Sequence, residues 1–211
     1  MTFKALATAL CAALTLFLSA TVSAARTLTI VAFGDSLTAG YQLPPEEAFP
    51  ARLEALARSK GVDVTVANAG VSGDTTADGL ARLDWSIPDG TDGVILELGA
   101  NDALRGLSPE ESRKNLDSML ARLSERGIPV LLAGIMAPPN MGADYEARFN
   151  AIFPDLAKKH GVPHYPFFLD GVVLDGALKL DDGMHPNGKG TKVMAETFFP
   201  AFETFVGSIP R

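Results

Sequence analysis

Three residues of this chain have the types and surroundings of a nucleophile, its base and the group that orients the base. Ser36 follows the apolar run 27–33 after a Gly-Asp dipeptide, and His185 lies three residues after Asp182. A serine hydroxyl becomes nucleophilic only when a base within hydrogen-bond reach removes its proton, and that base needs a third group to fix its tautomer. We therefore expect Ser36 to attack an acyl carbon, His185 to act as the base and Asp182 to orient His185.

Three hydrogen-bond donors are expected to stabilise the anion that such an attack creates on the carbonyl oxygen. They are the backbone N–H of Ser36, the backbone N–H of Gly73 and the side-chain amide of Asn101. Gly73 has no side chain, which allows a substrate to approach its backbone closely. Donors already aimed at the developing charge lower the barrier of acyl transfer, so the sequence predicts an oxyanion hole at these residues.

The elements that must position these residues alternate along the chain. Short runs rich in Val, Ile and Leu are separated by amphipathic stretches, which indicates a parallel sheet buried on both faces by helices. Strands are expected at 27–33, 62–67, 93–98, 130–134 and near 163–167, and helices at 46–58, 76–83, 109–126, 145–160 and 189–205. Pro154 is expected to kink or divide the fourth helix. The predicted fold class is a three-layer α/β fold with a five-stranded parallel sheet, in which ligands bind at the carboxyl ends of the strands.

Four segments of the chain resemble the SGNH hydrolases, also called the GDSL family. They read GDSLTAGY (34–41), NAGVSGDT (68–75), LELGANDALRG (96–106) and DDGMHPN (181–187). The resemblance is closest to the bacterial periplasmic thioesterase I/arylesterase/lysophospholipase branch. It implies a flavodoxin-like α/β/α sandwich, a triad of Ser36, Asp182 and His185, and an oxyanion hole of Ser36, Gly73 and Asn101. Ala100 departs from the glycine that often stands there in that branch, and we expect a change of pocket shape from it.

The resemblance implies a serine esterase that hydrolyses acyl esters, aryl esters, acyl-CoA and lysophospholipids through an acyl-enzyme on Ser36. Two alternatives stay open at this point. The same machinery could remove O-acetyl groups from carbohydrates or cell-wall glycans, as in other branches of the family. The chain could also be a non-catalytic periplasmic binder that keeps only the fold.

The first residues have the composition of a signal peptide. Lys4 is followed by an apolar run at 6–20, and the small residues around Ser23 form a cleavage pattern. We expect a signal peptide at 1–24 and a single hydrolase domain at 25–211, located in the periplasm or secreted. The only cysteine, Cys11, would leave with that peptide, so disulfides, thiolate metal sites and a cysteine nucleophile are excluded.

Composition also limits the partners. The formal charge of −7 and the lack of a Lys/Arg cluster disfavour nucleic acid. No His/Glu pair has metalloprotease spacing, so we expect no metal and no cofactor. The partner expected is a small acyl ester or thioester, with a monomeric mature protein that does not insert stably into a membrane.

Several other polar residues are expected to serve the structure. Asn68 and Asp102 are predicted to hold loops, and Asp74 is predicted to cap a helix. His160 and His164, at an expected helix end and strand start, are predicted to be structural.

Overall fold

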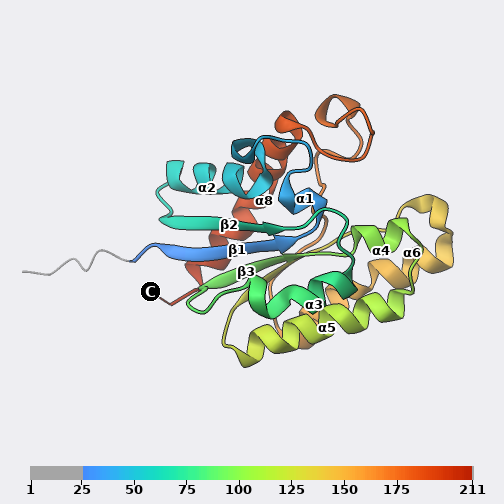
Figure 1. The fold of residues 1–211 in the computed structure, drawn as a ribbon, viewed down its shortest axis with the longest axis horizontal. Coiled ribbons are helices and arrows are strands. Elements are labelled where there is room, and N and C mark those ends of the chain that lie inside the picture. The colour runs from blue at the N-terminus through green and yellow to red at the C-terminus, as the bar shows by residue number, and fades with distance from the viewer. Residues whose placement is uncertain (1–25, 211) are drawn as a thin grey trace, which may run out of the picture.

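The computed structural model describes residues 26–210, and the expected signal peptide at 1–24 lies outside them. Five parallel strands form one sheet in the order β2-β1-β3-β4-β5 (Figure 1). The strands are β1 (Leu28–Gly34), β2 (Val64–Gly70), β3 (Gly93–Glu97), β4 (Val130–Ala133) and β5 (His164–Tyr165). This is the flavodoxin-like order, so the prediction of a parallel α/β fold is confirmed.

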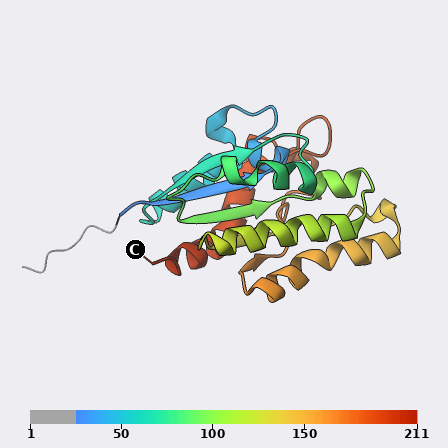
Figure 2. The same ribbon diagram turned by 60° about the horizontal axis from the view of Figure 1, so that its bottom comes forward.

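Helices cover both faces of the sheet. The longer ones are α2 (Phe49–Ser59), α3 (Thr76–Ser86), α5 (Pro109–Glu125), α6 (Ala143–Asn150), α7 (Ile152–His160) and α8 (Gly188–Gly207). α2 packs against α8 over one face, while α3, α5 and α7 pack side by side over the other (Figures 1 and 2). The sheet is therefore the middle of three layers, and its strands are apolar because both faces exclude water.

The register of the strands brings distant segments together at one edge. β1 pairs with β2 up to Gly34 and Gly70, and with β3 up to Phe33 and Leu96. Parallel strands end on the same side, so the segments that follow β1, β2 and β3 emerge next to one another. Two short helices begin there, α1 (Ser36–Ala39) and α4 (Ala100–Leu104), and short 3-10 turns lie at Pro45–Glu47, Pro139–Met141 and Gly176–Leu178.

The helix predicted at 145–160 is divided, as expected from its proline. α6 ends at Asn150 and α7 begins at Ile152, so Pro154 is the third residue of the second helix. In the first turn of a helix the missing N–H of proline has no intrahelical partner to lose. Pro200 lies inside α8, and that helix nevertheless continues to Gly207.

An aromatic cluster joins α2 and α8 on the face of the sheet that these two helices cover. The ring of Phe198 lies 5.3 Å from that of Phe49, 5.9 Å from Phe168 and 4.6 Å from Tyr165, in edge-on or strongly tilted contacts. Phe198 is 1% exposed. Large buried rings in such contact contribute much of the free energy that holds a helix to its sheet.

Replacing Phe198 by alanine tests this packing. We expect Phe198→Ala to lower the free energy of unfolding by about 3–5 kcal/mol, because a large cavity replaces a fully packed ring. Urea denaturation measures the change. Trp85→Ala, at a side chain that is 75% exposed, is the control and should stay within about 0.5 kcal/mol of the unsubstituted protein. Equal losses in the two variants would contradict the assignment of the core.

Candidate active site

Ser36, His185 and Asp182 form a continuous line of polar contacts at the carboxyl edge of the sheet. The Nε2 atom of His185 lies 2.9 Å from Ser36 Oγ, and its Nδ1 atom lies 2.6 Å from Asp182 Oδ2. The structure therefore brings together the three residues that the sequence predicted to act as nucleophile, base and orienting group.

The carboxylate of Asp182 is held by the backbone as well as by the imidazole. Its Oδ1 atom accepts the N–H groups of Met184 at 2.8 Å and His185 at 2.9 Å. Hydrogen bonds to the ionised form, led by that from Met184, lower the pKa of Asp182 to about 2. The group beside His185 is therefore a carboxylate over the whole neutral pH range.

Ser36 is presented by a tight turn between β1 and α1. Asp35 caps the short helix, and its Oδ1 atom accepts the N–H of Leu37 at 3.0 Å. Gly34 ends the strand where a Cβ atom would lie 2.2 Å from Thr38 Oγ1 and 2.4 Å from Glu97 Oε2. Only glycine fits this approach, which is why the turn that exposes Ser36 begins with it.

The segment that carries His185 is anchored on both sides. The N–H of Leu180 donates to the carbonyl of His185 at 2.8 Å, and Asn187 caps α8 by accepting the N–H groups of Lys189 and Gly190. The ring of Tyr41 packs against the imidazole, with ring centroids 4.5 Å apart. Sequence reasoning missed this contact. The only signal in the sequence was that Tyr41 lies close to Ser36 along the chain.

The three expected oxyanion donors come from segments that are tied to one another. Asn101 Nδ2 donates to the carbonyl of Asp74 at 3.0 Å and to Asp35 Oδ2 at 3.3 Å, so it bridges the residue after Gly73 and the residue before Ser36. Gly73 has a φ of 91°, which favours glycine. Within residues 26–210, the backbone N–H groups of Ser36 and Gly73 donate to no other group.

Side chains around this edge hold the loops in place. Asn68 donates to the carbonyl of Ala39 at 3.1 Å and accepts the N–H of Gly70 at 3.0 Å. Asp102 accepts both the N–H and the hydroxyl of Thr76, at 2.8 and 2.6 Å, and the hydroxyl of Ser112 at 2.8 Å. Both residues make the loop contacts that the sequence predicted.

The prediction that Asp74 caps a helix is wrong. The cap of α3 is Thr75, whose hydroxyl accepts the N–H of Asp78 while the Asp78 carboxylate accepts the N–H of Thr75. Asp74 instead pairs with Arg82, with Oδ2 2.5 Å from Nε. Aspartate and threonine are both good caps, so the residue types alone did not distinguish Asp74 from its neighbour Thr75.

The other two histidines lie outside the triad. His160, at the end of α7, contacts Asp117 with Nε2 2.6 Å from Oδ1. His164 begins β5, and burial lowers its pKa. Neither contacts Ser36, Asp182 or His185 within the described residues.

Two buried carboxyl groups lie directly beneath the Ser36 turn. Glu97, at the end of β3, accepts the Thr38 hydroxyl at 2.7 Å and the N–H of Asp35 at 3.3 Å through Oε2, while its buried Oε1 has no partner among residues 26–210. Burial, with a smaller effect of the adjacent Asp35, raises the pKa of Glu97 well above its usual value. Burial also raises the pKa of Asp35 to about 7. At neutral pH the pair therefore retains a proton, because two adjacent charges without water are strongly disfavoured.

Sequence reasoning missed Glu97 as part of this edge. The signal was a single glutamate within the apolar run GVILEL, where a charged side chain has to find a partner inside the protein.

No group of three or more His, Cys, Asp or Glu side chains in residues 26–210 is arranged to hold a metal ion. In the same residues, no helix has both the length and the apolar character needed to cross a membrane.

Comparison with known proteins shows what the chain is similar to. The GDSL-like Lipase/Acylhydrolase family matches residues 32–193. An arylesterase of Vibrio mimicus is 40% identical over 184 residues, which cover 87% of this chain and 92% of the relative. The Thioesterase 1/protease 1/lysophospholipase L1 of Escherichia coli strain K12 is 39% identical over 177 residues, or 83% of this chain and 84% of the relative.

A solved structure shows the same similarity in three dimensions. The crystal structure of AlinE4, described as a SGNH-hydrolase family esterase, matches with a TM-score of 0.73 and 45% identity. The match covers 85% of this chain and 96% of AlinE4.

The buried carboxyl pair predicts a particular dependence of stability on pH. Groups whose pKa is raised on folding stabilise the fold below their unfolded pKa of about 4, and this contribution is lost as the pH rises through the folded values. We expect the free energy of unfolding of Glu97→Gln, measured by urea denaturation between pH 5 and pH 9, to fall less steeply than that of the unsubstituted protein. The difference should be on the order of 2 kcal/mol at the alkaline end.

Glu196→Gln is the matched control, since Glu196 on α8 is exposed and lies 3.9 Å from Lys192. It should leave the pH dependence unchanged. If Glu97→Gln kept the full slope, the retained proton at Glu97 would be refuted.

Proposed function

Because the chain belongs to the GDSL-like lipase/acylhydrolase family, we propose that Ser36, His185 and Asp182 are the catalytic triad of a serine esterase. Members of this family are serine hydrolases, and this chain is one of them. One observation carries the proposal: Ser36 Oγ, the two imidazole nitrogens of His185 and the Asp182 carboxylate are in contact at 2.9 and 2.6 Å.

In the acylation step, Nε2 of His185 takes the hydroxyl proton while Ser36 Oγ forms a bond to the carbonyl carbon of the substrate. The Asp182 carboxylate keeps the other nitrogen protonated and stabilises the imidazolium that forms. When the tetrahedral intermediate collapses, the imidazolium gives its proton to the leaving alcohol or thiol. The acyl group then remains on Ser36.

In the deacylation step, His185 takes a proton from water, and the resulting hydroxide attacks the acyl carbon. Collapse of the second intermediate releases the carboxylic acid and returns the proton to Ser36. The backbone N–H groups of Ser36 and Gly73 are proposed to bind the carbonyl oxygen in both steps. Asn101 joins them by turning one N–H away from its longer bond to Asp35, which measures 3.3 Å.

We propose carboxylic esters and thioesters, including aryl esters, acyl-CoA and lysophospholipids, as substrates. The similar proteins carry the names arylesterase and thioesterase 1/protease 1/lysophospholipase L1. Exposed apolar side chains also follow the strands at this edge and suit an acyl chain; they include Tyr41, Val71, Leu104, Leu107 and Met136. The alternative of a glycan O-acetyl esterase is not favoured by the named relatives.

The location of the protein is proposed from its first residues. The basic residue, apolar run and small residues of 1–24 support export and cleavage before Ala25. We propose that residues 25–211 then form a single hydrolase domain, monomeric, in the periplasm or outside the cell.

Replacing the nucleophile tests the proposed triad. We expect Ser36→Ala to lower kcat on p-nitrophenyl esters by at least about 10³-fold, because no acyl-enzyme can form. Asp182→Asn should lower kcat by about 10²–10⁴-fold, since the amide no longer selects the required imidazole tautomer. Ser59→Ala, at an exposed serine that ends α2, is the control and should retain full activity. A Ser36→Ala enzyme with unchanged kcat would refute the proposal.

A substrate panel then separates the classes. We expect acyl esters, acyl-CoA and lysophospholipids to be hydrolysed and acetylated sugars to be left intact. Every activity should be lost in Ser36→Ala. Release of acetate from acetylated glycans, without hydrolysis of acyl thioesters, would contradict the proposed substrate class.

Export gives an independent prediction. When the full chain is produced in a bacterium, N-terminal sequencing of the exported protein should begin at Ala25. An intact Met1 in that fraction would contradict the proposed cleavage.

A further inference from the structure

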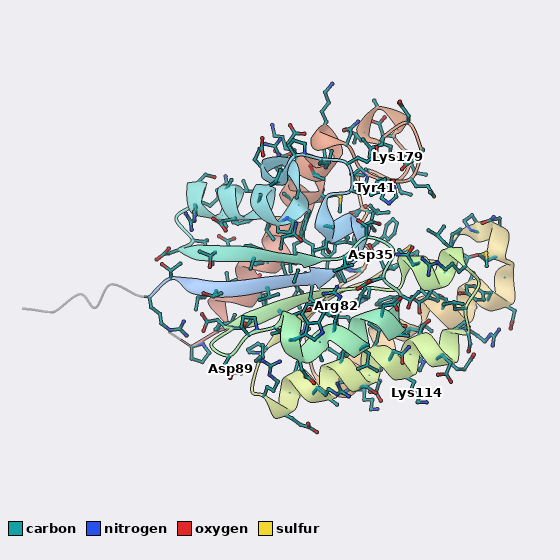
Figure 3. The ribbon with its side chains drawn as sticks, in the orientation of Figure 1. Asp35, Tyr41, Arg82, Asp89, Lys114 and Lys179 are labelled. Atoms are coloured by element: carbon teal, nitrogen blue, oxygen red, sulfur yellow. The ribbon has the colours of Figure 1, made fainter. Side chains whose placement is uncertain are left out.

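A buried cation contacts two of the segments that carry the proposed active site and has no part in the proposed mechanism. Arg82, on α3, is 7% exposed, and its guanidinium carbon lies 4.0 Å from the centre of the Phe33 ring. Figure 3 shows Arg82 on the side of the sheet that α3 covers and Asp35 nearer the carboxyl end of β1. A buried guanidinium is costly unless its N–H groups are paired, so its partners indicate what it does.

The guanidinium donates hydrogen bonds to two segments of the chain at the place where they leave the sheet. Nη2 donates to the carbonyl of Gly34 at 2.8 Å, and Nη1 donates to the carbonyl of Ala69 at 2.9 Å, at the ends of the adjacent strands β1 and β2. Nε donates to Asp74 Oδ2 at 2.5 Å, in the loop that follows β2. The strand ladder extends one step further, since the N–H of Val71 donates to the carbonyl of Gly34 at 3.0 Å, and Arg82 adds side-chain connections between the same two segments.

Each of these segments carries part of the proposed active site. Gly34 lies two residues before Ser36. Asp74 is the neighbour of Gly73, and its carbonyl accepts the side-chain amide of Asn101 at 3.0 Å. A single planar side chain therefore contacts both the segment that bears Ser36 and the segment that bears Gly73, and Asn101 is tied to the second segment through the carbonyl of Asp74.

We propose that Arg82 is a positioning residue that sets the separation between the Ser36 nucleophile and the oxyanion donors of Gly73 and Asn101. This inference rests on the proposed function. Arginine suits the role because its donors lie in a fixed plane and point in different directions. A lysine at this position would keep the charge, yet its compact ammonium group on a flexible stem cannot hold the acceptors of Gly34, Ala69 and Asp74 at once.

The effect of replacing Arg82 differs according to whether the residue only stabilises the fold or also positions the oxyanion donors. If it only stabilised the fold, its replacement would lower the melting temperature and the amount of active protein, with the same kcat for every folded molecule. If it positions the donors, kcat falls in the folded enzyme while KM changes little, because the lost interactions are made only in the transition state.

The test is the variant Arg82→Lys, with active sites counted by titration to completion with a p-nitrophenyl phosphonate. We expect kcat per titrated site to fall about 10- to 100-fold while KM stays within about twofold. The rate constant of phosphonate inactivation should fall by a similar factor, because the phosphonyl oxygen needs the same donors. The control is Arg122→Lys, since Arg122 on α5 is half exposed and lies 3.4 Å from Asp84; it should keep both rates.

Asp74→Asn provides a second variant that preserves side-chain shape and removes the charge paired with Arg82. It should also lower kcat at constant KM. The double variant Arg82→Lys/Asp74→Asn should lose little more than the worse single variant, because the two residues act through one contact.

A kcat of Arg82→Lys or Asp74→Asn within twofold of the unsubstituted enzyme would overturn the inference, as would fully multiplicative losses in the double variant. If Ser36→Ala is inactive while Arg82→Lys keeps its kcat, only this inference fails. A Ser36→Ala enzyme that stays active would overturn the proposed function and the inference with it.

Discussion

The contact between Ser36 Oγ and His185 Nε2 is the interaction on which the proposed chemistry depends. The two residues are 149 positions apart in sequence, so every element between them contributes to their 2.9 Å separation. β1 lies inside the sheet between β2 and β3 and ends at the carboxyl edge with Ser36, while the loop before α8 brings His185 to the same edge. A parallel sheet makes this possible, because all of its strands end on one side and their loops converge there.

The same edge concentrates buried charge. The carboxyl groups of Asp35 and Glu97 lie beneath the Ser36 turn, and the guanidinium of Arg82 lies on the α3 side. Burial without full hydrogen bonding costs stability, and Glu97 Oε1 has no partner among the described residues. The hydrogen bonds from Thr38 and Asp35 to Glu97 lie in a medium of low dielectric constant, which strengthens them, and they hold the Ser36 turn against β3.

Much of the fold followed from the sequence. The apolar runs separated by amphipathic stretches predicted all five strands and the five long helical regions, because burial on two faces or on one stripe imposes those periods. The short α1 and α4 helices were not predicted, since four or five residues at the end of a strand carry no periodicity. The start of the long helix expected at 109–126 agrees with its local sequence, since Ser108 Oγ accepts the N–H groups of Glu110 and Glu111.

The geometry that the sequence determined most directly is local. The three-residue spacing of Asp182 and His185 lets the carboxylate reach the imidazole within one turn of chain, whatever the rest of the protein does. Tertiary structure alone decided that Glu97 lies against Asp35, that Tyr41 packs on His185, and that Asp74 pairs with Arg82. Such contacts depend on which strands lie next to one another in the sheet, and the period of hydrophobic residues along a chain does not encode that order.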